Sequence, residues 1–202
     1  AYLEGYAQPE PEGRTDVRTA VQNVLAQLKK AERPVLYAGN GIRLSGGMQA
    51  FKRLCQVLRI TVVTCWGSID LIGTDDVLYV GRGGNMGDRA GNFAVQNSDM
   101  VLSIGASMSI NQVGRNTKTW ARAAYVAMVD IDPLEMEKWI VHVDLPICAD
   151  ASEFMEVLLH EAEGMSLSYD AWLQRCAAWK ERYPVVQERH RKASGKVNLY
   201  AF

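Results

Sequence analysis

Short apolar runs alternate with segments of helical periodicity along most of this chain. A first helix is expected over residues 17–30, with Thr15 or Asp16 as its N-cap. Its apolar residues recur at helical spacing and would share one buried face: Val21, Val24, Leu25 and Leu28. Further helical patterns begin at Ser45 and Asp88, and another covers residues 152–160.

Six runs rich in apolar or β-branched residues predict strands between these helices. They cover residues 33–38, 60–64, 77–80, 100–104, 123–129 and 140–143. Apolar strands that alternate with helices are typical of a parallel sheet covered on both faces. We therefore predict an α/β fold, doubly wound and Rossmann-like, with about six parallel strands.

The pattern changes on either side of this domain. Residues 1–15 are rich in proline and glutamate and are interpreted as a linker, and residues 16–163 form the predicted central α/β domain. Residues 164–202 would be a helical connector, with an amphipathic helix over 169–182. Residues 187–202 offer little to bury, so we expect them to be mobile or ordered only against another copy.

Composition narrows the classes of function. The net charge is −1, which favours neither a nucleic-acid partner nor an anionic membrane. No apolar run reaches the roughly 20 residues that span a bilayer. The four cysteines form no Cys-x-x-Cys pair and the three histidines show no zinc-ligand spacing. We therefore expect the cysteines to be free thiols in a reducing compartment, and the cytoplasm is the expected location.

The turns that follow the strands carry the candidate chemistry. Gly39-Asn40-Gly41 follows the first strand, but Leu44 occupies the place of the third glycine of a dinucleotide fingerprint. The two glycines still indicate a tight turn whose backbone amides stay open to an anion. The alternative is an ordinary strand-to-helix turn.

Three other turns are weaker signals. The loop 81–89 holds four glycines and would let backbone amides approach a ligand, unless it is only a flexible surface loop. Gly105-Ala106-Ser107 and Asp130-Ile131-Asp132-Pro133 each follow a strand, where an acid can accept hydrogen bonds from a ribose or adenine group. Asp132-Pro133 is equally a normal helix start. No nucleophile elbow and no P-loop occurs in the sequence.

Taken together, these turns resemble the central domain of thiamine-diphosphate-dependent enzymes of the acetolactate synthase family. The resemblance covers roughly residues 17–160 continuously, and the tail is similar in general character. The segments that carry it are Arg33 to Gly41, Val62 to Gly67, Asn92 to Asp99 leading to Ile104-Gly105-Ala106, and Val129 to Pro133. Val197-Asn198-Leu199-Tyr200 is similar to the Val-Asn-Pro-Tyr start of the family's C-terminal domain.

The resemblance implies a 2-keto-acid carboligase or decarboxylase, a transferase or lyase that works as a homodimer or homotetramer. In that family, thiamine diphosphate and magnesium lie between an N-terminal pyrimidine domain and a C-terminal diphosphate domain. The family's Gly-Asp-Gly motif does not occur in this sequence. We therefore expect a scaffold domain that has no catalytic residues and no metal site of its own and is inactive alone.

Relatives use the central domain to hold FAD or an ADP-type nucleotide, or leave it empty. The FAD-binding relatives carry an Arg-Phe-Asp-Asp-Arg-type run where this chain has Ser107-Met108-Ser109-Ile110-Asn111, so we expect FAD to bind weakly or not at all. The residues predicted to line a nucleotide pocket are Gly39, Asn40, Gly41, Trp66, Gly67, Gly87, Gly105, Ala106, Ser107 and Asp132. The alternatives are a freestanding FAD- or NAD-binding module, like electron-transfer flavoprotein or sirtuin domains, and a structural domain without a ligand.

Overall fold

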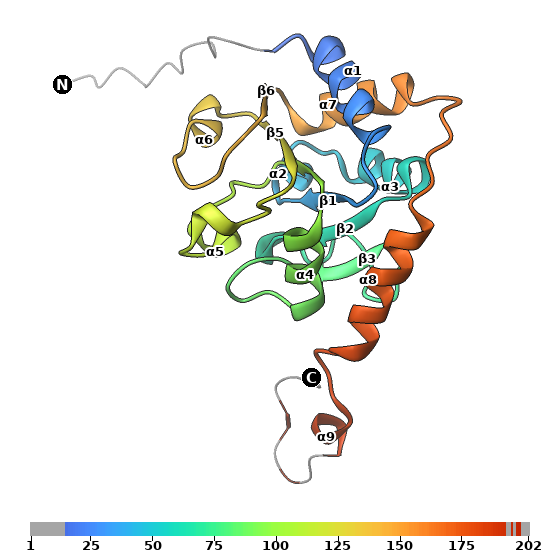
Figure 1. Cartoon of the computed structure of the whole chain (residues 1–202), viewed down its shortest axis with the longest axis vertical. Helices are drawn as coiled ribbons and strands as arrows, with labels where there is room; N and C mark the ends of the chain where they lie inside the picture. Colours follow the sequence, from blue (N-terminus) through green and yellow to red (C-terminus); the bar gives the residue numbers. More distant parts are fainter. Residues whose placement is uncertain (1–14, 193–194, 196, 199–202) are drawn as a thin grey trace, which may run out of the picture.

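The computed structural model describes residues 15–192, 195 and 197–198. Within these residues, six parallel strands form one sheet in the order β3-β2-β1-β4-β5-β6 (Figure 1). The prediction of a doubly wound, Rossmann-like α/β fold is confirmed. The strands are β1 (Pro34–Ala38), β2 (Thr61–Thr64), β3 (Tyr79–Arg82), β4 (Met100–Ile104), β5 (Tyr125–Asp130) and β6 (Leu145–Cys148).

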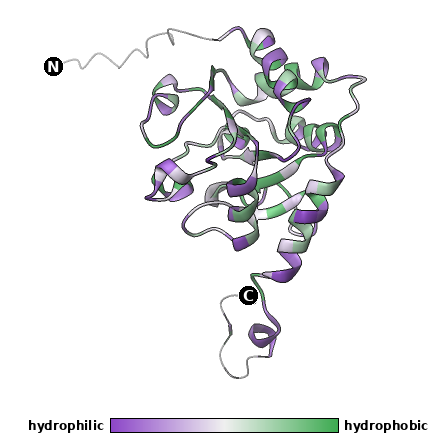
Figure 2. Cartoon of the chain, viewed as in Figure 1, coloured by the Kyte–Doolittle hydropathy of each residue, from purple (hydrophilic) through white to green (hydrophobic). Residues whose placement is uncertain are grey.

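The middle of the sheet is the core of the domain. Every residue of β1, β2 and β4 is buried, and Leu36 of β1 pairs with Val62 on one side and Leu102 on the other. Continuous apolar burial is expected for parallel strands with helices on both faces. Figure 2 shows these strands as hydrophobic and the outward sides of the surrounding helices as hydrophilic.

Two groups of helices cover the sheet (Figure 1). In the first, α7 (Ala151–Glu161) packs against both α1 (Val17–Leu28) and α3 (Met48–Leu58). In the second, α4 (Arg89–Asn97) and α8 (Asp170–Arg182) pack on each other and on β2 and β3. The short helices are α2 (Gly41–Leu44), α5 (Ile110–Val113), α6 (Pro133–Met136) and α9 (Glu188–Arg191), with 3-10 turns at η1 (Trp66–Ser68) and η2 (Thr117–Thr119).

The first helix follows its prediction closely. Asp16 is the N-cap of α1 and accepts a hydrogen bond from the backbone N–H of Arg18. The four apolar residues expected on one face are all buried: Val21, Val24, Leu25 and Leu28. The helix ends at Leu28, two residues before the predicted end.

The last strand was predicted wrongly at residues 140–143, because the strand lies at Leu145–Cys148. Residues 137–144 form a loop that ends where Asp144 exchanges hydrogen bonds with Val126 at the start of the β5–β6 pairing. Pro146 is tolerated inside β6 because this strand is an edge of the sheet. Proline has no backbone N–H, and on the outer side of an edge strand there is no neighbouring strand whose carbonyl would need that N–H.

The helix predicted to begin at Ser45 is also different. Helix α2 begins directly at Gly41, residues 45–47 are not helical, and α3 begins at Met48. The helix is interrupted because Gly46 has a φ of 73°, which is incompatible with a continuous right-handed helix. The Ser45 hydroxyl donates to the Ile42 carbonyl and closes α2.

The two strands predicted at residues 77–80 and 123–129 both begin at later residues. The Asp76 carboxylate accepts the Leu78 N–H and holds a turn, so β3 begins at Tyr79. Similarly, Ala124 donates to the Ala121 carbonyl in a turn, so β5 begins at Tyr125. Side-chain character alone did not reveal these turns.

The segment after residue 164 contains a helix that docks on the domain. Trp172 and Cys176 of α8 are buried, as is Tyr169 just before the helix, whose hydroxyl donates to the Leu28 carbonyl at 2.7 Å. Beyond it, α9 has no buried residue. The expectation of mobility for residues 187–202 falls partly outside the described residues, as does the linker over residues 1–15.

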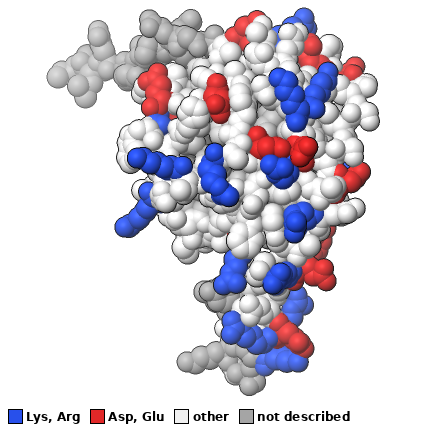
Figure 3. Space-filling model, in the orientation of Figure 1, with Lys and Arg blue, Asp and Glu red and all other residues white. Residues whose placement is uncertain are grey.

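On the face of the molecule in view, the described charged side chains form no large region of one sign. Figure 3 shows both signs interspersed on the visible face and gathered on the lower part of the molecule, where α8 ends and α9 lies. No helix among residues 15–192 combines the length and apolar character needed to cross a membrane. All four cysteines are buried and none forms a disulfide, as the sequence indicated: Cys55, Cys65, Cys148 and Cys176.

Candidate functional site

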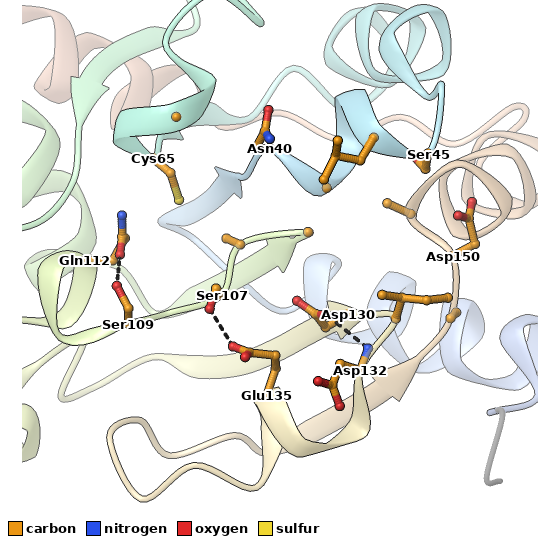
Figure 4. Close-up of a pocket in the computed structure, with 18 residues that line it drawn as sticks. Asn40, Ser45, Cys65, Ser107, Ser109, Gln112, Asp130, Asp132, Glu135 and Asp150 are labelled. Carbon is orange, nitrogen blue, oxygen red and sulfur yellow. Dashed lines mark hydrogen bonds between the residues drawn. The ribbon is translucent and has the colours of Figure 1, made fainter. Parts of the chain in front are cut away.

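A cavity of about 670 Å³ lies at the carboxyl ends of the central strands. The turns after β1 and β4 form its floor, and the turns after β5 and β6 form one wall (Figure 4). The strand order reverses between β1 and β4, which is the switch point where open α/β sheets bind ligands. We call this space the carboxyl-edge cavity.

The floor is built by direct contact between two backbone turns. Gly39 N–H donates to the Ile104 carbonyl and Gly41 N–H to the Gly105 carbonyl, each at 2.9 Å. A Cβ on Gly39 would lie 2.0 Å from the Gly105 oxygen, and one on Gly41 would lie 2.7 Å from the Gly105 Cα. The tight turn has amides that were expected to stay open to an anion, but those of Gly39 and Gly41 are both used to join the turns.

Aspartates dominate the wall from β5 and β6. Asp132 caps α6 by accepting the Leu134 N–H, and Asp150 caps α7 by accepting the Ser152 and Glu153 N–H groups. Both caps explain why the sequence places an acid at these turns.

Asp130 lies at the end of β5, and its Oδ1 accepts the Asp132 N–H at 3.1 Å (Figure 4). Burial raises the pKa of Asp130, and the nearby carboxylates of Glu135 and Asp132 raise it further, against hydrogen bonds from the Asp132 and Ile131 N–H groups.

A hydrogen-bonded group centred on Glu135 joins the turns after β4 and β5. The Ser107 hydroxyl donates to Glu135 Oε2 at 2.6 Å, and Lys138 forms an ion pair with the same carboxylate. Burial acts to raise the pKa of Glu135, but the hydrogen bonds from Lys138 and Ser107 together lower it. Glu135 is therefore ionised, and the positive charge of Lys138 is neutralised beside the cavity.

The opposite wall is polar but neutral. Asn40 Oδ1 accepts a hydrogen bond from Arg43, whose guanidinium also pairs with Asp70. Gln112 Oε1 accepts from the Ser109 hydroxyl (Figure 4). Burial raises the pKa of Cys65 to about 12, so this thiol is neutral at physiological pH and is not an activated nucleophile.

The structure brings most of the predicted site residues together. Seven of the ten line the carboxyl-edge cavity: Asn40, Gly41, Gly67, Gly105, Ala106, Ser107 and Asp132. Gly39 does not line the cavity; it packs against Gly105 and Ala106.

The other two predicted residues, Trp66 and Gly87, lie along a separate groove of about 1160 Å³, which we call the arginine groove. It also contains Arg82, whose guanidinium lies 5.4 Å from the Trp66 ring centroid, and Arg182 at the end of α8. The predicted pocket thus combined two neighbouring hollows that the structure separates.

Several polar residues of the cavity were missed: Ser45, Cys65, Ser109, Gln112, Asp130, Glu135 and Asp150. Asp130 was visible as an acid directly after a strand. Asp150 follows β6 in the same way, but the misplaced last strand hid its position. Glu135 and Gln112 gave no signal, because only the tertiary arrangement of α6 and α5 places them at the cavity.

Comparison with known proteins agrees with this architecture. Residues 21–158 match the family described as thiamine pyrophosphate enzyme, central domain. The chain is 29% identical over 179 residues to an acetolactate synthase large subunit of Lactococcus lactis, covering 89% of this chain and 30% of that protein. It is 32% identical over 157 residues to a probable acetolactate synthase large subunit of Methanocaldococcus jannaschii, covering 74% and 26%.

A third relative, the acetolactate synthase large subunit of Parasynechococcus marenigrum, is 29% identical over 186 residues, covering 90% of this chain and 29% of that protein. The chain therefore spans less than a third of the length of these curated relatives. None of these matches supports the alternative of a freestanding FAD- or NAD-binding module. The family match covers more than half of the chain, and the chain belongs to the thiamine pyrophosphate enzyme central-domain family.

Proposed function

We propose that this chain serves as the central domain of a larger thiamine-diphosphate-dependent enzyme that forms or breaks carbon–carbon bonds of 2-keto acids. The match to the central-domain family over residues 21–158 carries the proposal. The acetolactate synthases among its relatives favour a carboligase, a transferase or lyase in class. The full-length enzyme would be a homodimer or homotetramer, and a cytoplasmic location is in keeping with four cysteines that form no disulfide.

The described residues do not fit the thiamine-diphosphate and magnesium unit. Among residues 15–192, 195 and 197–198, no group of three or more His, Cys, Asp or Glu side chains is arranged to hold a metal ion. The acids at the carboxyl-edge cavity are engaged in other ways: Asp132 and Asp150 are helix caps, and Glu135 is in an ion pair with Lys138. We therefore assign this cofactor to neighbouring pyrimidine and diphosphate domains and derive no step through it.

Within the enzyme, the chain would act as a scaffold with a ligand pocket. The carboxyl-edge cavity lies at the switch point and is large enough for a small organic ligand. Its seven predicted lining residues are the proposed contacts. Aspartates on the wall from β5 and β6 would repel the diphosphate of FAD or ADP, so we expect these ligands to bind weakly.

An activity assay tests the assignment of the chemistry. The purified chain, supplied with thiamine diphosphate, magnesium and pyruvate, should show no steady-state consumption of pyruvate, because the cofactor cannot be positioned. The matched control is the full-length protein under the same conditions, which should consume pyruvate or another 2-keto acid. Cofactor-dependent turnover by the chain alone, or no turnover by the full-length protein with any 2-keto acid, would contradict the proposal.

A further inference from the structure

Another cavity, of about 640 Å³, lies at the opposite edge of the sheet from the carboxyl-edge cavity. It is lined by residues 32–33, 96–97 and 122–123, which shortly precede β1, β4 and β5, and by α8. The amino ends of these three parallel strands lie together, because β1, β4 and β5 are neighbours in the sheet. We call this space the amino-edge cavity.

Hydrogen bonds hold two arginines of this cavity at adjacent carbonyls. Arg33 Nε donates to the Asn97 carbonyl at 2.8 Å, and Arg122 Nη1 donates to the Gln96 carbonyl at 3.3 Å. Gln96 and Asn97 are the last two residues of α4, whose last turn has no basic residue of its own. The two guanidinium groups therefore lie close together at the end of a helix, where a positive charge is favourable.

A third arginine comes from α8. The Arg175 guanidinium lies 5.9 Å from the Trp179 ring centroid, and the rings of Trp179 and Trp172 meet edge to face at 5.6 Å. The Trp172 indole N–H donates to the carbonyl of Pro34, the residue after Arg33. A continuous series of contacts therefore runs around the cavity from one arginine to the next.

Two of the three positive charges are uncompensated. Arg33 forms ion pairs with Glu32 at 3.4 Å and with Asp99 at 3.8 Å. Within the part of the chain that the structure describes, Arg122 and Arg175 form no ion pair, and Arg175 donates no hydrogen bond. Guanidinium groups bind phosphate oxygens through paired N–H donors. Two unpaired positive charges match a dianion, such as a phosphate monoester, better than a single carboxylate.

Apolar side chains complete the lining. Trp179 is half-buried, and Ala123 and Ala171 are exposed. Trp172 is 4% exposed and supports Trp179 from below. An inorganic anion would leave this apolar surface in water, whereas an organic phosphate would cover it.

We propose that the amino-edge cavity binds a small organic phosphate, whose phosphate group contacts Arg122 and Arg175 and whose apolar group contacts Trp179. Such a ligand links α8 to the segment before β5 and stabilises the docking of α8 on the domain. The site lies at the edge of the sheet away from the carboxyl-edge cavity, so it does not depend on the proposed chemistry or on the ligand pocket.

Fluorescence titration of the purified chain measures binding, because Trp172 and Trp179 both line the cavity. The probes are phenyl phosphate, inorganic phosphate and phenol. Phenyl phosphate should bind about tenfold more tightly than either of the others, because it alone combines charge-assisted hydrogen bonds with apolar contact. It should also raise Tm above the value in sodium chloride of equal ionic strength, since a ligand that binds only the folded state stabilises it.

The variants Arg175→Gln and Arg122→Gln test the two arginines. Arg175 has only its ring contact with Trp179, so its replacement should leave the fold intact. Each variant should weaken the binding of phenyl phosphate about tenfold, because it removes charge-assisted hydrogen bonds. The matched control is Arg115→Gln, because Arg115 is exposed and does not line the cavity.

The proposal is supported if phenyl phosphate binds more tightly than the other two probes, and if this binding weakens in Arg175→Gln and persists in Arg115→Gln. Equal binding of phenol, or equal binding of inorganic phosphate, overturns it. Unchanged affinity in Arg175→Gln also overturns it, as does the failure of phenyl phosphate to bind. None of these results alters the assay with pyruvate, so the proposed function is tested separately.

Discussion

Two neighbouring hollows differ sharply in charge. The carboxyl-edge cavity is formed by the turns after β1, β4, β5 and β6 and contains four carboxylates. The arginine groove lies beside β2 and β3 and contains Arg82, Arg89 and Arg182, with Asp88 as its acid. Arg82 and Asp88 pair at 2.7 Å, whereas Arg89 and Arg182 both lie over the Tyr183 ring.

Helix ends explain much of this difference. Asp132 and Asp150 are N-caps of α6 and α7, where a negative charge stabilises the helix. Arg182 lies in the last turn of α8, where a positive charge does the same. Side chains that stabilise helix ends therefore also determine the charge of each hollow. A ligand pocket can acquire its selectivity from residues whose local role is capping.

The variant with the largest expected effect weakens the docking of α8, the helix that borders the arginine groove. Trp172 is 4% exposed, and its indole N–H donates to the Pro34 carbonyl at 3.1 Å. Trp172→Ala should lower the free energy of unfolding by about 3–5 kcal/mol, because it leaves a large cavity beneath α8. Since α8 carries Arg182, tryptic cleavage at that residue should accelerate.

Trp139→Ala is the matched control, because Trp139 is 82% exposed. Its stability in urea should stay within about 0.5 kcal/mol of the unaltered chain. If tryptic cleavage at Arg182 were no faster in Trp172→Ala than in the unaltered chain, the arginine groove would not depend on the docking of α8.

The second test acts on the floor of the carboxyl-edge cavity. Gly39→Ala would place a Cβ 2.0 Å from the Gly105 oxygen, so the turns after β1 and β4 must separate. We expect the free energy of unfolding, measured by urea denaturation, to fall by about 3 kcal/mol. Gly67→Ala is the control in the same cavity, because its Cβ would meet only Asn40 Cβ at 3.9 Å. Equal stability of the two variants would refute the close packing of the turns.

The fold could be predicted from periodicity because burial dictates it. Residues 100–104 were assigned to a strand with the bounds of β4, since every position in it is buried between two helical layers. The last strand was misplaced because residues 140–143 are as apolar as β6 itself. Only the hydrogen bonds between Asp144 and Val126 reveal where pairing begins.

The site was predictable where it depends on the ends of strands. Gly105 and Asp132 follow β4 and β5, and turns at the carboxyl edge meet in space whatever their distance in sequence. The charge of the cavity was not predictable, because it depends on which acids are paired. The ion pair between Glu135 and Lys138 and its contact with Ser107 require α6, which packs on β5 and β6, to lie near the turn after β4.

The smallest expected effect concerns Asp130, the half-buried acid of the carboxyl-edge cavity. Burial raises its pKa above the ordinary value of 3.8, so the folded state holds the proton more tightly than the unfolded state. The ionised carboxylate therefore lowers stability when the pH is above the raised pKa, and this cost disappears below pH 3.8. Asp130→Asn keeps an oxygen that can accept the Asp132 N–H, so it should raise Tm at pH 7 by about 2 °C. Thermal melts followed by circular dichroism at pH 7, 5 and 3.5 should show this gain shrinking as the pH falls. A lower Tm at pH 7 would mean that the cavity needs the charge of Asp130 for its own structure. The difference in charge between the carboxyl-edge cavity and the arginine groove would then be required for folding.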